Sequence, residues 1–278
     1  MESLRSMRVG ASTGVAQASS DSRKDRAMTA QVEIRHFVVG EHPHVAVKND
    51  FGTIRAYRGA GQHEVGVQIT RRNRIFGHAP ESVHASYEQE DSGNELAVTI
   101  QREEFSLATS TTEVDVDIAL PARSDLDLVT KAGTITVTDV HGQLVLASAA
   151  GTISVRHSLL TGDSRLSTEA GSLHFEGAIE PHGSYQFTAT VGAIHVVLLN
   201  TPAFHVDAST TLGTITTNLP NMVVAHPTVV GSEAHAEVGM EPRALLVLKS
   251  TIGAIELQAW ALASAENSAV SEGQYALG

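Results

Sequence analysis

The chain has 278 residues, is 42% hydrophobic but only 4% aromatic, and carries a net charge of −12. An acidic surface repels nucleic acid and anionic membranes, so we expect neither nucleic-acid binding nor membrane insertion. The absence of cysteine excludes disulfides, thiolate metal sites and thiol catalysis.

The two ends of the chain are predicted to lie outside the folded part. Residues 1–30 are rich in Ser, Arg, Lys, Asp and Ala and have no apolar stretch typical of a signal peptide, which indicates a disordered leader. Residues 261–278 are small and polar and are expected to form a flexible tail. No segment reaches the roughly eighteen consecutive apolar residues of a membrane span. We therefore expect a cytoplasmic protein by default, with a surface or secreted location as the alternative.

Residues 31–121 are predicted to form a β-rich N-terminal cap that contains a first repeat copy around Gly52. Alternating apolar residues at 65–69, 96–100 and 114–118 indicate three strands with one solvated face each. Such a cap would cover the open end of a repeat stack.

Residues 122–260 are predicted to form a β-repeat stack, because a glycine followed by a small residue and an aliphatic one recurs there. Including the copy in the cap, these predicted turn glycines are Gly52, Gly133, Gly151, Gly171, Gly192, Gly213 and Gly253. The five middle ones are 18, 20, 21 and 21 residues apart. The last step is 40 residues, as if one copy had decayed. Each glycine is expected at a corner that needs an unusual backbone angle or a close approach.

Other positions keep register with the glycine. Two residues after it come Ile54, Ile135, Ile153, Leu173, Ile194, Ile215 and Ile255. Five residues before it come Val47, Leu128, Leu146, Leu166, Phe187, Ala208 and Leu248. Each copy therefore predicts two short strands with one buried face. Three residues before the glycine lie small, mostly hydroxyl-bearing residues, which could bond along a stack as a ladder of like side chains.

These patterns predict an all-β fold. The preferred architecture is a β-solenoid-like stack of about seven rungs, in which each strand pairs with its equivalent about 4.8 Å above and below. The alternative is a β-sandwich or meander with similar strand lengths.

Three stretches resemble one known family. Val45–Ile54, with the sequence VAVKNDFGTI, is similar to its opening strand and glycine turn. Val114–Pro121, with the sequence VDVDIALP, is similar to the strand that precedes its repeats, and the Ala-Gly-Thr-Ile repeats follow. The family is the bacterial putative-adhesin family of β-strand-repeat proteins, a domain of unknown function, and the resemblance covers roughly residues 32–258. It implies a non-enzymatic β-repeat domain.

Histidines are the first candidate ligands. His42 and His44, with His36 nearby, form the densest group, but Pro43 disturbs their geometry and no third ligand is indicated. His174 and His195 occupy the same position in neighbouring copies, so stacking would place them about 5 Å apart on the outer face. A bridging ion or a pH-sensitive repulsion is one reading of this pair. The preferred interpretation of both groups is solvated histidine.

Threonines and carboxylates give no site either. Thr134, Thr136, Thr214 and Thr216 point outward, as in ice-binding arrays, but other residues interrupt the array and β-propensity explains them better. Asp139, Asp163 and Asp207 fall at different offsets from their glycines and are not expected to converge as a catalytic pair.

We therefore predict no catalytic, cofactor or metal residues and no enzyme. The first functional hypothesis is a structural or interaction module with a protein or glycan partner. The alternatives are a carbohydrate-active enzyme on a β-solenoid and a regulatory, envelope-associated module.

Overall fold

The computed structural model describes residues 30–59, 61–73, 83–90, 93–102, 112–200, 203–219, 222–225, 231–240 and 243–260. The predicted leader, apart from Ala30, and the predicted tail lie outside these ranges. Three-quarters (75%) of the described residues lie in β-strands and only 1% in helix, so the all-β prediction is confirmed.

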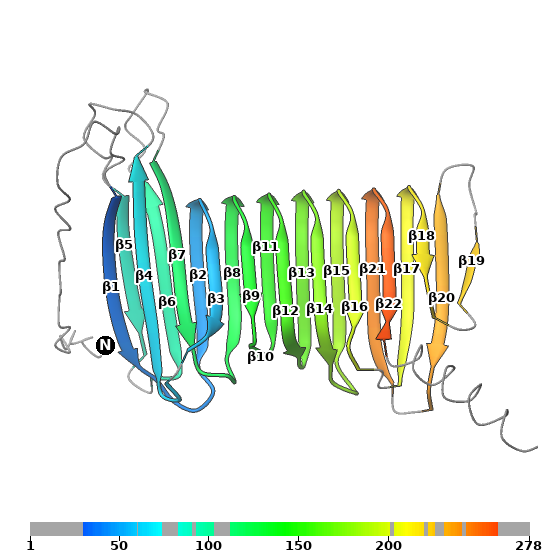
Figure 1. Cartoon of the computed structure of the whole chain (residues 1–278), viewed down its shortest axis with the longest axis horizontal. Helices are drawn as coiled ribbons and strands as arrows, with labels where there is room; N and C mark the ends of the chain where they lie inside the picture. Colours follow the sequence, from blue (N-terminus) through cyan, green and yellow to red (C-terminus); the bar gives the residue numbers. More distant parts are fainter. Residues whose placement is uncertain are drawn as a thin grey trace, which may run out of the picture.

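Two mixed sheets of eleven strands each face one another and are not closed into a barrel (Figure 1). Sheet A runs in the order β1 (Ala30–Val38), β4 (Glu64–Asn73), β7 (Thr112–Leu120), β3 (Ile54–Arg58), β9 (Ile135–Thr138), β12 (Ile153–Leu160), β14 (Leu173–Ile179), β16 (Ile194–Leu198), β22 (Ile255–Ala259) and β18 (Ile215–Thr217), with β10 (His141–Gly142) beside β12. Sheet B runs in the order β19 (Val223–Ala225), β20 (Ser232–Val238), β17 (Phe204–Leu212), β21 (Ala244–Ile252), β15 (Ser184–Val191), β13 (Asp163–Ala170), β11 (Leu144–Ala150), β8 (Asp125–Ala132), β2 (His44–Phe51), β6 (Glu95–Arg102) and β5 (Val83–Gln89).

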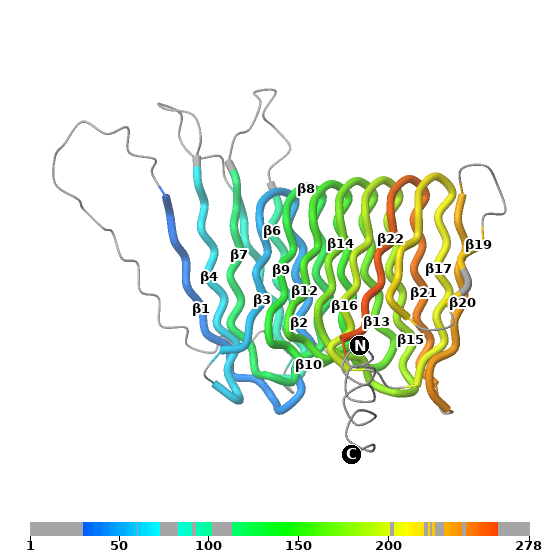
Figure 2. The backbone as a smooth tube through the Cα atoms, turned by 45° about the vertical axis from the view of Figure 1, so that its right-hand side comes forward, coloured from blue at the N-terminus to red at the C-terminus, as the bar shows by residue number. Residues whose placement is uncertain are grey.

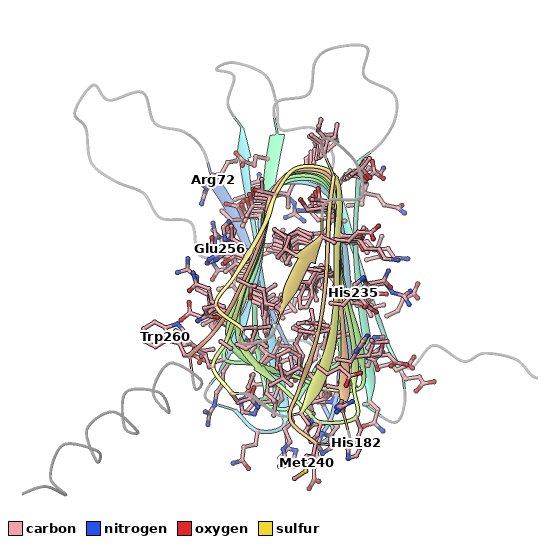
Figure 3. The ribbon with its side chains drawn as sticks, turned by 90° about the vertical axis from the view of Figure 1, so that its right-hand side faces the viewer. Arg72, His182, His235, Met240, Glu256 and Trp260 are labelled. Atoms are coloured by element: carbon pink, nitrogen blue, oxygen red, sulfur yellow. The ribbon has the colours of Figure 1, made fainter. Side chains whose placement is uncertain are left out.

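The core lies between the sheets and is aliphatic, as the composition predicts. Alternate residues of each strand point inward, so β8 buries Leu126 and Leu128 while Asp125 and Asp127 lie on the outer side. This alternation is what period-two sequence patterns produce on a pleated sheet. Down the long axis, the inward side chains fill the space between the two sheets (Figure 3).

Repeat copies pair in parallel and in the predicted register. The residue two after the glycine pairs from copy to copy, with Ile135 beside Ile153, Ile153 beside Leu173, and Leu173 beside Ile194. Two large facing sheets fit the β-sandwich alternative, whereas parallel pairing between successive copies is what a stack requires. Antiparallel pairs occur at the two ends of the molecule, in β1–β4–β7, β5–β6 and β17–β20–β19.

The order of copies in space differs from their order in sequence. The copy of Gly253, formed by β21 and β22, lies between the copies of Gly192 and Gly213 (Figure 1). The chain leaves β18, forms strands β19 and β20 at the end of sheet B, and then returns to fill the inner place. The expected decayed copy between Gly213 and Gly253 is therefore wrong, because those residues form an antiparallel end structure.

The N-terminal end shows the same kind of insertion. Strand β2 lies between β6 and β8, and β3 lies between β7 and β9 (Figure 2). The 81-residue step from Gly52 to Gly133 is thus occupied by the strands that extend the two sheets outward to β1 and β5.

Candidate interaction surface

Sheet B strands lead into sheet A strands at the predicted turn glycines, which form one long corner of the molecule. Six of the seven have φ between 120° and 150°, a conformation that L side chains rarely adopt, and Gly213 is the exception. The space beside these glycines is as restrictive as their φ angles. A Cβ at Gly151 would lie 1.8 Å from the carbonyl oxygen of Gly133, and one at Gly213 would lie 2.0 Å from that of Gly253. The corner therefore holds successive backbones closer together than any side chain allows.

The corner carbonyls accept hydrogen bonds from side chains of the neighbouring copy. The hydroxyl three residues before a glycine donates to the glycine carbonyl of the neighbouring copy. These bonds are Ser148 to Gly133 at 3.4 Å, Thr168 to Gly151 at 3.2 Å, Ser250 to Gly192 at 3.2 Å and Thr210 to Gly253 at 3.0 Å. Ser232 of β20 completes the series by donating to Gly213 at 3.2 Å. The hydroxyls thus bond to backbone rather than to one another, which corrects the expected ladder of like side chains.

Three copies depart from this pattern. In the copy of Gly52, the side-chain amide of Asn49 donates to the Val114 carbonyl at 2.8 Å. Thr130 is buried, yet its Oγ1 has no hydrogen-bond partner. Ala189 occupies the equivalent position in the copy of Gly192 and cannot donate to Gly171. These exceptions make the contribution of the hydroxyl measurable within one protein.

The residues immediately before the corner glycines form an exposed apolar row, which we call the corner row. In spatial order it consists of Phe51, Ala132, Ala150, Ala170, Val191, Ile252 and Leu212, each paired in register with the next. Phe51, Val191, Ile252 and Leu212 are 42–48% exposed. No polar side chain interrupts the row.

Small or uncharged residues border most of the corner row. On the sheet A side, the residues after the glycines are Thr53, Thr134, Thr152, Ser172, Ala193, Ala254 and Thr214 in spatial order. On the sheet B side they are Asp50, Lys131, Ala149, Glu169, Thr190, Thr251 and Thr211. Lys131 forms an ion pair with Asp50 at 2.6 Å. The half of the row that contains the branched aliphatics therefore lies in an uncharged band.

The outer face of sheet A brings together the two predicted neighbouring histidines. The rings of His174 and His195 have centroids 5.7 Å apart at an interplanar angle of 63°, and they pair in register. His195 Nε2 lies 3.4 Å from a carboxylate oxygen of Glu256. Burial, together with His195 and Arg156, lowers the pKa of His174. The pair therefore favours the neutral form of His174.

A second polar cluster lies on the outer face of sheet B at its C-terminal end. Asp207 Oδ1 is 2.5 Å from His235 Nδ1 and 3.2 Å from His205 Nε2. The hydrogen bond with His235, against the opposing effect of burial and with help from His205, lowers the pKa of Asp207. Arg243 holds Glu237 at 2.8 Å beside this group. The cluster ties β20 to β17, where Asp207 and His235 are register partners.

The N-terminal end of the core is closed by inward-pointing charges. Glu33 of β1 accepts hydrogen bonds from Arg71 and Arg35 at 2.9 Å and from the Tyr87 hydroxyl of the opposite sheet at 3.1 Å. Burial raises the pKa of Glu33, but these hydrogen bonds outweigh it and leave the pKa below its ordinary value. Phe37 packs on Tyr87 with ring centroids 5.6 Å apart. Inward charges on an edge strand oppose uncontrolled pairing with other chains.

The remaining sequence candidates do not form a site. His36 of β1 is hydrogen-bonded to Glu64 of β4 in sheet A, whereas His44 begins β2 in sheet B and His42 lies just before it. Asp139 follows β9 in sheet A, whereas Asp163 and Asp207 lie on β13 and β17 in sheet B. The outward threonines 134, 136, 214 and 216 are separated along the stack by other residue types. In the part of the chain that the structure describes, no group of three or more His, Asp or Glu is placed to hold a metal ion.

Sequence reasoning missed the corner row, although the signal was available. The position before each glycine is apolar in all seven copies, as regular as the buried columns. A column that lies next to a turn and still excludes polar residues indicates an exposed apolar surface, which soluble chains keep small.

Comparison with known proteins gives structural likeness without sequence matches. No family model and no curated protein matches the sequence. A putative cell adhesion protein from Clostridium sporogenes is similar with a TM-score of 0.49 and 13% identity, over 84% of this chain and 100% of that one. A putative adhesin from Bacteroides fragilis has a TM-score of 0.42 and 11% identity, over 82% and 97%. One from Parabacteroides distasonis has a TM-score of 0.26 and 13% identity, over 83% and 97%.

The names of these structural neighbours agree with the family that the sequence resembles. Within the described ranges, no helix is long and apolar enough to cross a membrane.

Proposed function

We propose that the protein is a non-enzymatic, adhesin-like interaction module whose contact surface is the corner row. The observation that carries the proposal is the uninterrupted line of apolar side chains, all exposed except the partly exposed Ala132, along a corner whose glycine carbonyls are held by hydrogen bonds. Contiguous exposed apolar surface on a stable fold marks an interaction site more often than chance.

The chemistry of the row favours a protein partner over a glycan. Six of its seven members are aliphatic, and Phe51 is its one aromatic residue. Apolar side chains surrounded by small polar ones resemble the core and rim of protein interfaces. A sugar would be expected to require more aromatic faces and more hydrogen-bonding side chains than this corner offers.

The proposal also includes a solenoid arrangement of the repeat copies. We take each of the seven glycines to mark one rung of a solenoid, in the spatial order 52, 133, 151, 171, 192, 253 and 213. Parallel register between copies supports this interpretation. Residues 31–121 would then be the N-terminal cap with the first repeat, and residues 122–260 the stack.

An adhesin-like role also implies a surface or secreted location. The cytoplasmic location expected from the sequence has no support in the comparisons. We therefore prefer a surface or secreted location, where the corner row would face other molecules outside the cell.

The proposal is tested by capturing partners with the full chain from a lysate and on a glycan array. Leu212→Lys places a charge in the row, and Thr216→Lys places the same charge four residues away on the exposed outer face of sheet A. We expect capture to be lost with Leu212→Lys and kept with Thr216→Lys, while both variants melt like the wild type. Equal capture by both variants would show that the row is not the contact surface.

A further inference from the structure

We propose that the corner row binds the corner row of a second copy of this chain, in an antiparallel arrangement with a two-fold axis between Ala170 and Val191. This inference builds on the proposed function, because it names the partner of the same surface.

The sizes of the side chains are self-complementary about that axis. The row has three alanines on one side of the axis, Ala132, Ala150 and Ala170, and three branched aliphatics on the other, Val191, Ile252 and Leu212. An antiparallel partner would place Val191 opposite Ala170, Ile252 opposite Ala150, and Leu212 opposite Ala132. Every opposed pair thus combines one small and one large side chain, so the gap between the two corners is uniform.

A two-fold interface requires this kind of self-complementarity, since the same patch supplies both sides. A parallel arrangement would oppose alanine to alanine and leucine to leucine. It would leave a gap at one end and crowding at the other, with the loss of contact that voids bring.

The bordering residues allow the same register. With the axis placed there, Lys131 would lie opposite Thr211, Ala149 opposite Thr251, and Glu169 opposite Thr190. No charged residue of this column meets a like charge from the other copy. On the sheet A side the opposed residues are Thr, Ser and Ala, which are short enough for the rows to touch.

The interface between the two corner rows is small, so the dimer is expected to be weak. Six exposed or partly exposed side chains from each copy bury on the order of 700 Å² in total, below the roughly 1,200 Å² of stable interfaces. Two copies with a charge of −12 each also repel one another, and salt screens that repulsion. We therefore expect a weak dimer that is favoured by salt and by crowding, as many copies on one surface would provide.

Cysteine cross-linking tests the arrangement, because the chain has no native cysteine. Ala132→Cys in one copy and Leu212→Cys in the other would face each other across the interface. Within each variant alone, the two equivalent cysteines would lie five rungs apart, about 24 Å at the spacing of paired strands. A disulfide needs Cα atoms within about 7 Å.

We expect mild oxidation to give a covalent dimer when the two variants are mixed, and little when either is oxidised alone. One variant should carry a tag so that the mixed product is recognised by mass. Efficient cross-linking of each variant alone would overturn the antiparallel pairing, because it would indicate parallel or random contact. No cross-linking in any combination at high salt and protein concentration would overturn self-association. If Leu212→Lys still abolished capture of another protein, the proposed function would stand with a different partner.

Discussion

The corner hydroxyls offer a quantitative test of what holds the paired repeat copies together. Thr168 and Thr130 occupy the same position in different copies, and both are buried, with 3% and 1% of their surface exposed. Thr168 Oγ1 donates to the Gly151 carbonyl, whereas Thr130 Oγ1 has no partner. Replacing either by valine keeps the branched shape and removes the hydroxyl.

The two substitutions should therefore change stability differently. Thr168→Val loses a hydrogen bond and leaves the Gly151 carbonyl unpaired, which should cost about 1–3 kcal/mol. Thr130→Val removes a buried hydroxyl that has no partner, so we expect it to be neutral or stabilising by up to about 1 kcal/mol. For a folded region of this size, each kcal/mol corresponds to about 2–4 °C in Tm.

Urea unfolding followed by far-ultraviolet circular dichroism measures this difference. We expect the midpoint of Thr168→Val to fall and that of Thr130→Val to stay or rise, with unchanged dependence on urea concentration. A third variant, Ala189→Ser, supplies the missing donor for Gly171 and should stabilise the fold by about 1 kcal/mol. Equal losses in Thr168→Val and Thr130→Val would refute the hydrogen-bonded corner.

Three further tests, using four substitutions, address the register, the corner and the histidine column. Ile153→Asp buries an unpaired charge and should unfold the protein. Thr152→Asp places the same charge on the outer side and should melt within a few degrees of wild type. Similar melting curves for the two variants would contradict the assigned register. Gly151→Ala should lower the free energy of unfolding by more than about 4 kcal/mol, because its Cβ would lie 1.8 Å from the Gly133 carbonyl oxygen. A loss near 1 kcal/mol in chemical unfolding would argue against that close approach. Because the pKa of His174 is lowered in the fold from its ordinary value of 6.5, the unfolded chain binds the proton more readily, so stability should fall as pH drops below 6.5. His174→Gln should weaken this dependence in thermal melts, and an unchanged pH profile would count against it.

The sequence was informative where the fold is periodic. Ile135, Ile153, Leu173 and Ile194 could be aligned because each repeats the same offset from its glycine, and the structure pairs them accordingly. The offset says which residues face inward. It also says which residues share a column, since stacking brings equal positions together.

The order of the copies could not be derived from the same signal. The inner residues of the Gly213 and Gly253 copies, such as Ile215 and Ile255, are alike, so either copy can pair with Ile194. Nothing in the periodic pattern distinguishes the two arrangements. The choice depends on strands β19 and β20, which pair antiparallel and lack the glycine signature.

Contacts between strands at the two ends of the molecule could not be predicted from the sequence either. Asp207 and His235 meet because β20 runs antiparallel to β17, and Glu33 meets Tyr87 because β1 and β5 end opposite sheets. Neither pair is linked by sequence spacing. The corner row, in contrast, is visible in the sequence as a column of apolar residues directly before the glycines.

Self-association through the corner row is tested most directly by sedimentation velocity over a range of protein concentrations at high salt. Wild-type protein and Thr216→Lys are predicted to shift reversibly toward dimer as concentration rises, while Leu212→Lys remains monomeric with an unchanged melting temperature. Wild-type protein that stays monomeric throughout, or Leu212→Lys that associates as wild type does, would contradict self-association through the row.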